Sequence, residues 1–267
     1  DALVALQEKA VSSGVPMHMH LGETRYQSDY AQKRTGTTAI KHLKHLGLLG
    51  PLLTLGHGVW LDAEDIEIIA ETGTCICHNC SSNKRLGSGR APVTTFLEHG
   101  ITVALGIDEA GINDDRDMLL EMRLVLYEHR APGHDSRWPS ASEVLRMATE
   151  GGAATVCTSR PVGRIVSGAS ADCILVNEKR LFYPYQDSNV PLINALVQRI
   201  SSSAIDAVYV AGNAVVRQGK LTMVDEHNIY EEIAAQLSKD RDPDELAALE
   251  FSRRIVPFLR EFYRGSF

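Results

Sequence analysis

Short uninterrupted apolar runs alternate along this chain with longer stretches in which apolar residues recur every three or four positions. The short runs predict strands buried on both faces; they are Val15–His20, Leu52–His57, Cys75–His78 and Ile101–Asp108. The periodic stretches predict helices at Ala2–Val11, Thr37–Leu46, Ala63–Thr72, Pro92–Gly100, Met118–His129 and Ser140–Thr155. A polar loop is expected before Gly36, and a long loop rich in Ser and Gly is expected before Pro92.

The order of these elements predicts an α/β fold. Each predicted strand is followed by a helix, which is typical of parallel strands joined by helical crossovers. No GxGxxG sequence follows a strand, so half of a (β/α)8 barrel fits better than a nucleotide-binding sheet. We therefore assign residues 1–160 to strands five to eight of a barrel and their helices.

The pattern of residues along the chain changes after residue 160. GRIVSGASADCILVN and AIDAVYVAGNAVVRQGKL combine Gly turns with alternating Val, which predicts part of a small β-sandwich over residues 161–225. Residues 226–267 are predicted to be helical again.

Composition narrows the functional classes. The 267 residues carry a net charge of −7 with 44% hydrophobic and 23% charged residues, which argues against nucleic acid as a partner. No apolar run approaches the length of a membrane span, so no membrane partner is expected. Five cysteines, an odd number, favour a reducing compartment, and we expect a cytoplasmic protein.

Every predicted strand ends in a residue that can bind a metal or carry a proton: His20, His57, His78 and Asp108. Catalytic groups of a barrel project from the carboxyl ends of its strands. Glu23 follows His20 by three residues, so an imidazole and a carboxylate can reach one spot. The alternative interpretation is that these are structural residues of the core, and for His78 this alternative carries the same weight as a functional role.

Four motifs at these strand ends resemble the amidohydrolase superfamily, in its branch of nucleobase and purine-type deaminases and triazine chlorohydrolases: HMHLGET, LGHGVWLDAEDI, HNCSSNKRLGSGRAPV and LGIDEAGINDDRDMLLEMR. The resemblance implies that His20 and Asp108 bind the metal. It also implies that Glu23 is the acid/base and that His57 touches the attacking water or the substrate. GRIVSGASADCILVN and VYVAGNAVVRQGK resemble the flanking β-sandwich of these enzymes.

The resemblance further implies hydrolytic deamination of a small nitrogen heterocycle, and these residue types provide a mechanism for it. A divalent metal, Zn²⁺ with Fe²⁺ as the alternative, lowers the pKa of bound water and supplies hydroxide. Asp108 takes the proton of that water, and Glu23 protonates the ring nitrogen and assists the departure of ammonia. His78, Asn83 and Glu109 are predicted to contact the substrate.

The sequence departs from the family pattern in two places. The residues flanking Asp108 are Ile107 and Glu109, where this branch has Thr and Gly, so a carboxylate is added to the wall facing the ring. No His-x-His pair precedes His18, so we interpret the chain as the C-terminal two-thirds of an enzyme. Its open sheet edges predict self-association into a homo-oligomer.

Other interpretations remain open at this stage. An amide or C–Cl hydrolase of the same superfamily uses similar residues, and a non-catalytic fragment acting as an interaction module is a different class. The CICHNC segment is a weak candidate for a zinc knuckle, because no second Cys/His pair follows at finger spacing.

Glu109 generates the first prediction. If this carboxylate selects substrate without binding metal, Glu109→Gly in a complete enzyme will change the ratios of kcat/KM among heterocycles and leave the metal content unchanged. Steady-state kinetics on a substrate panel, together with metal analysis, measure both. Loss of the metal would make Glu109 a ligand instead.

Overall fold

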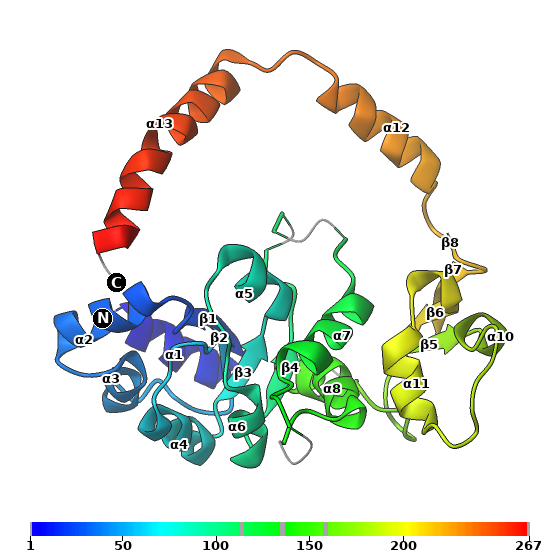
Figure 1. Cartoon of the computed structure of the whole chain (residues 1–267), viewed down its shortest axis with the longest axis horizontal. Coiled ribbons are helices and arrows are strands. Elements are labelled where there is room, and N and C mark those ends of the chain that lie inside the picture. The colour runs from blue at the N-terminus through cyan, green and yellow to red at the C-terminus, as the bar shows by residue number, and fades with distance from the viewer. Residues whose placement is uncertain (1, 110, 113–114, 134–136, 157–159, 266–267) are drawn as a thin grey trace. The chain divides into compact units, whose positions relative to one another are not determined.

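The computed structural model describes residues 2–109, 111–112, 115–133, 137–156 and 160–265 (Figure 1). The chain divides into two compact units, Asp1–Gly219 and Lys220–Phe267, and each is described by itself.

Four parallel strands form the first sheet: β1 (Met17–Leu21), β2 (Leu53–His57), β3 (Cys75–His78) and β4 (Val103–Leu105). They lie in the order β1-β2-β3-β4, which is also their order along the chain. The register pairs Leu21 with His57 and His78 with Leu105. The carboxyl ends of the strands therefore meet at one edge of the sheet.

Helices lie before, between and after these strands: α1 (Ala2–Ser13), α2 (Arg25–Thr35), α3 (Ala39–His45), α4 (Ala63–Thr72), α5 (Cys80–Leu86), α6 (Val93–Glu98), α7 (Met118–Glu128) and α8 (Ala141–Arg146). Helix α8 continues through a π-helical turn, Met147–Gly151, into α9 (Gly152–Ala154). This segment packs closely on β4, because a Cβ on Gly151 would lie 2.1 Å from the carbonyl oxygen of Val103. The α/β fold expected from the sequence is confirmed.

The core lies between this sheet and its helices. Ile76 of β3 and Phe96 of α6 are fully buried, as are Ile69 of α4 and Val125 of α7. Strand β2 is buried at all five positions, which agrees with its uninterrupted apolar run. Burial of each large side chain contributes about 1.5–3 kcal/mol, so this packing fixes the strand ends in place.

A second, antiparallel sheet contains β5 (Cys173–Val176), β6 (Ile205–Val210) and β7 (Asn213–Arg217). Between β5 and β6 lie α10 (Glu178–Leu181), α11 (Leu192–Arg199) and a 3-10 turn at Ser202–Ala204. The second unit holds β8 (Lys220–Leu221), α12 (Glu226–Leu237) and α13 (Pro243–Gly265). Among the described residues, no helix is both long enough and apolar enough to cross a bilayer.

Two helices lie where the sequence predicts loops, α2 and α5. The sequence of α2, RYQSDYAQKRT, has almost no apolar stripe, and none of its residues is buried. Its stability comes from its ends, where the Thr24 side chain accepts the Gln27 N–H and Gly36 adopts a left-handed conformation (φ 76°). Helix α5 likewise ends at the left-handed Gly87.

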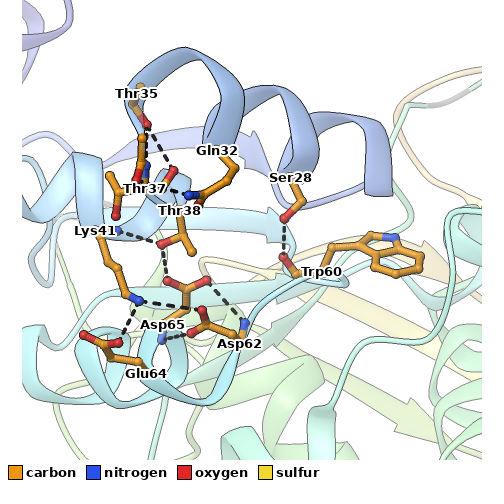
Figure 2. A network of polar contacts seen from close by, with 11 residues as sticks. Ser28, Gln32, Thr35, Thr37, Thr38, Lys41, Trp60, Asp62, Glu64 and Asp65 are labelled. Carbon is orange, nitrogen blue, oxygen red and sulfur yellow. Dashed lines mark hydrogen bonds and ion pairs between the residues drawn. The ribbon is translucent and has the colours of Figure 1, made fainter. Parts of the chain in front are cut away.

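Asp65 joins the first turns of α3 and α4 (Figure 2). Its carboxylate accepts the Thr38 hydroxyl at 2.5 Å and the Asp62 N–H at 3.3 Å, while the Asp62 side chain accepts the Asp65 N–H at 2.7 Å. Asp62 is therefore the N-cap of α4 and one half of a reciprocal capping box. Burial raises the pKa of the Asp65 carboxyl despite these bonds.

Asp65→Ala removes an acceptor from both helix starts, so the free energy of unfolding should fall by about 2 kcal/mol. Glu67→Ala, on the exposed face of α4, is the matched control and should leave stability unchanged within error. Urea denaturation of both variants measures the difference. Equal stability of the two variants would contradict a structural role for the Asp65 network.

Candidate active site

Three predicted site residues meet at the carboxyl edge of the first sheet. His20 lies near the end of β1, His57 ends β2, and Asp108 follows β4. The two histidine Nε2 atoms each lie 3.7 Å from a different oxygen of the Asp108 carboxylate. The His20 and His57 rings contact each other edge to face, with centroids 4.9 Å apart. The strand register thus brings together residues that are up to 88 positions apart in sequence.

His57 and Asp108 both have left-handed backbones, with φ of 74° and 65°. Residues other than Gly rarely adopt this conformation, and such strain concentrates at functional sites. His57 and Asp108, both identified from the sequence, are thus two of the five described residues other than Gly with a positive φ.

The His57 side chain is fully buried. Its Nδ1 lies 2.8 Å from the Asn83 Oδ1, and its Nε2 has no hydrogen-bond partner among the described residues. The nearest Glu23 oxygen is 3.9 Å from that Nε2. Unpartnered buried nitrogens are uncommon, and this one faces two carboxylates. A cation or a polar hydrogen placed there would be stabilised.

Asp108 accepts a hydrogen bond of 2.5 Å from the Ser82 hydroxyl. Its side chain is 5% exposed, whereas the His20 side chain is 62% exposed. Ser82 and Asn83 are consecutive residues of α5, so one short helix contacts both Asp108 and His57. Asn83, predicted to contact substrate, here contacts a predicted catalytic side chain.

A pocket opens beside these groups and is lined by His18, Met19, His20, Gly56, Cys77, Asn79, Gly106, Ile107, Asp108 and Glu109. Gly106 is needed for this shape, because a Cβ there would lie 2.5 Å from the Asn79 Oδ1 and 2.7 Å from the Cys77 Sγ. Glu109 is exposed beside Asp108 in this lining. Its prediction as a substrate contact stays a prediction.

The donor atoms of His20, His57 and Asp108 suit a divalent metal. One ligand atom from each lies within 4.8 Å of the others. Two ligands bound at 2.0–2.1 Å in tetrahedral geometry are about 3.4 Å apart, and the nitrogen–oxygen separations here are 3.7 Å. Three protein ligands of the N/O type match the composition of a catalytic zinc site.

A second cluster, His78, Cys80 and His129, is buried nearby. The Nε2 atoms of the two histidines lie 3.0 Å apart in a hydrogen bond. Burial lowers the pKa of His78 well below its ordinary value and lowers that of His129 to about 4. Burial also raises the pKa of the Cys80 thiol to about 12. Neutral, mutually bonded side chains of this kind stabilise a core without chemistry. His78 is not among the residues lining the pocket, and its role in substrate binding is a prediction still.

The comparison with known families rests on the same segments. The model of the amidohydrolase family matches residues 1–215. The chain belongs to the amidohydrolase family. The resemblance inferred from the strand-end motifs is thereby confirmed, and the family's barrel architecture agrees with the parallel βα order of the first sheet.

The relatives and solved structures that this amidohydrolase resembles include deaminases and a chlorohydrolase. The 5′-deoxyadenosine deaminase of Methanopyrus kandleri is 35% identical over 241 residues, covering 89% of this chain and 55% of that protein. A zinc-bound adenosine deaminase from Xanthomonas campestris matches with a TM-score of 0.80 and 25% identity, covering 86% of this chain and 52% of that one. The zinc complex of atrazine chlorohydrolase from Arthrobacter aurescens TC1 matches with a TM-score of 0.79 and 28% identity. The match covers 87% of this chain and 51% of that one. The chain spans about half the length of the proteins it matches.

Two contacts at the site lie outside the sequence-based interpretation. The partner of His78 is His129, which carries no motif and lies 51 positions further along the chain. Ser82 lies in the predicted loop after the third strand, where the sequence suggests a residue that shapes the site, but the sequence does not identify Asp108 as its partner. Each is a tertiary contact that no local spacing reveals.

The low pKa of His129 generates a prediction. Unfolded His129 takes up its proton near pH 6.5, whereas folded His129 does so near pH 4. Burial of neutral His129 therefore has no proton-linked cost above pH 6.5. As the pH falls from 6.5 toward 4, the unfolded chain gains a proton that the folded chain does not, so the free energy of unfolding decreases. The free energy of unfolding should fall by roughly 3 kcal/mol across this range, which is the equivalent of the shift in the His129 pKa.

His129→Gln keeps a hydrogen-bonding side chain but cannot titrate, so its stability should depend less on pH in this window. His45→Gln, at an exposed position, should retain the slope of the original chain. Urea denaturation at a series of pH values compares the three proteins. Identical slopes in all of them would refute the assignment.

Proposed function

We propose that this chain carries the catalytic half of a metal-dependent aminohydrolase, which releases ammonia from a nitrogen heterocycle. The observation that supports it most is the convergence of His20, His57 and Asp108, with Glu23 3.9 Å from His57. This arrangement provides metal ligands and a separate carboxyl group for proton transfer in one place.

His20 and Asp108 would hold the metal, with the unpartnered Nε2 of His57 facing the same point. When bound, a Zn²⁺ ion supplies Lewis acidity and lowers the pKa of water toward neutrality; Fe²⁺ is the alternative.

Each protein group then has its own task. Asp108 accepts a proton from the attacking water, and the Ser82 hydroxyl holds one Asp108 oxygen in place. Glu23, half-buried at the mouth of the site, donates a proton to the ring nitrogen and then assists the departure of ammonia. His57 hydrogen-bonds the attacking water.

The proposed substrate is a 6-aminopurine nucleoside or a related small heterocycle. Support comes from the printed activities of the relatives, a 5′-deoxyadenosine deaminase and an adenosine deaminase. His78 and Glu109 remain the proposed substrate-contacting residues, with Glu109 the more accessible of the two. The Asn83 side chain is instead buried against His57. An amide or C–Cl hydrolase is the second candidate, supported by the similarity to atrazine chlorohydrolase.

The organisation of the whole protein is also a proposal. We assign residues 1–160 to the last four strands of an eight-stranded barrel, residues 161–225 to part of a β-sandwich and residues 226–267 to a helical segment. The chain spans about half the length of the relatives it matches, which is consistent with this assignment. A homo-oligomer in the cytoplasm is consistent with the sheet edges and with the four unpaired cysteines in the described part of the chain.

Glu23 generates the test of the proposed function. In a zinc-loaded protein that includes the first half of the barrel, Glu23→Gln should lower kcat for ammonia release by roughly 10²–10⁴, because it removes the proton donor. Enzyme-coupled ammonia detection with adenosine and 5′-deoxyadenosine measures the rate, and metal analysis should find unchanged zinc.

Asp29→Asn, an exposed carboxylate on α2 paired with Arg25, is the matched control and should keep full activity. Chloride release from a chlorinated triazine, without ammonia release from any aminopurine, would favour the second candidate. Wild-type activity in Glu23→Gln would remove Glu23 from the mechanism.

A further inference from the structure

Asn83 stands out because it contacts a proposed catalytic side chain at the ring nitrogen that faces away from the site. The Asn83 Oδ1 lies 2.8 Å from the His57 Nδ1, and both side chains are buried. A carbonyl oxygen only accepts hydrogen bonds, so the Nδ1 must carry the proton that is shared. A neutral imidazole has a single N–H, and the other nitrogen then presents a lone pair.

That other nitrogen, the His57 Nε2, is one of the buried side-chain atoms without a hydrogen-bond partner among the described residues. It lies 3.7 Å from an Asp108 oxygen and 3.9 Å from a Glu23 oxygen. Three electron-rich atoms therefore face one small volume, which is stable only when a water hydrogen or a cation lies between them.

The backbone of α5 holds Asn83 in this position. The Asn83 N–H binds the carbonyl of Asn79 at 2.9 Å, and the Asn83 carbonyl accepts the Ser88 N–H at 2.9 Å. The Asn83 side chain is 3% exposed, so it has little freedom to turn. A contact that is buried and fixed at both ends can select one tautomer of its partner.

We propose that Asn83 is a positioning residue: it holds the proton on the His57 Nδ1 and so directs the lone pair of Nε2 at the attacking water. The proposal rests on the proposed function for the identity of that water, but the tautomer itself is a property of this chain. In this proposal Asn83 does not contact the substrate, although the sequence predicts that it does, but acts through His57. Groups that fix the tautomer of an active-site histidine are worth 10–100-fold in activity or metal affinity.

The test measures the tautomer directly. In the 267-residue chain labelled with ¹⁵N-histidine, two-bond ¹H–¹⁵N correlation spectra distinguish a protonated ring nitrogen from one with a lone pair. The spectrum of His57, assigned with His57→Gln, is expected to show the proton on Nδ1. Asn83→Leu, similar in size but without an acceptor, should lose this preference, and Asn83→Asp should retain it.

Lys84→Ala is the matched control, because Lys84 is the next residue of α5 and its ammonium pairs with Glu128 at the surface. It should leave the His57 spectrum unchanged. Circular dichroism of each variant checks that the fold is kept. If Asn83→Leu does not fold, the wild-type spectrum and Asn83→Asp still decide the proposal.

A proton on the His57 Nε2 in the wild-type chain would overturn the proposal, since the Asn83 amide would then donate. An unchanged tautomer in folded Asn83→Leu would overturn it too. In the complete zinc-loaded enzyme, Asn83→Leu should lower kcat by about 10–100-fold with little change in KM. If the tautomer follows Asn83 but no aminopurine releases ammonia, the positioning role stands and the proposed function fails.

Discussion

The parallel register of β1 to β4 is the constraint on which the rest of the structure depends. Because the strands run in one direction in sequence order, every one of them delivers its last residue to the same edge. The fully buried β2 and the buried Ile76 of β3 fix that register against the helices. A slip of one residue would turn each strand-end side chain to the other face of the sheet. His20, His57 and Asp108 converge only while this core holds.

Backbone strain and an unmet hydrogen bond both occur at the site. His57 and Asp108 have left-handed backbones, and a buried nitrogen of His57 lacks a partner among the described residues. Each of these features costs on the order of 1–3 kcal/mol in the absence of a ligand. Helix α5 offsets part of this through Ser82 and Asn83, which bind the two strained residues. Such an arrangement is typical of a site that stores strain for binding or catalysis.

The sequence predicts those parts of this fold that depend on local pattern. Uninterrupted apolar runs locate the strands, and the ends of those runs identify His20, His57 and Asp108. Helix α2 is not predicted from the sequence, because it is stabilised by its capping residues and has no apolar stripe. The hydrogen bond between His78 and His129 escapes because it joins β3 to the end of α7 across the core. Tertiary contacts of this kind leave no periodic signal in a single sequence.

The position of a bound zinc ion tests the account most directly. Crystals of the zinc-loaded protein, measured on both sides of the zinc absorption edge, would locate the ion by its anomalous scattering. The account predicts one peak within about 2.2 Å of a His20 nitrogen and an Asp108 oxygen. A peak between His78, Cys80 and His129, with none at the strand ends, would contradict it.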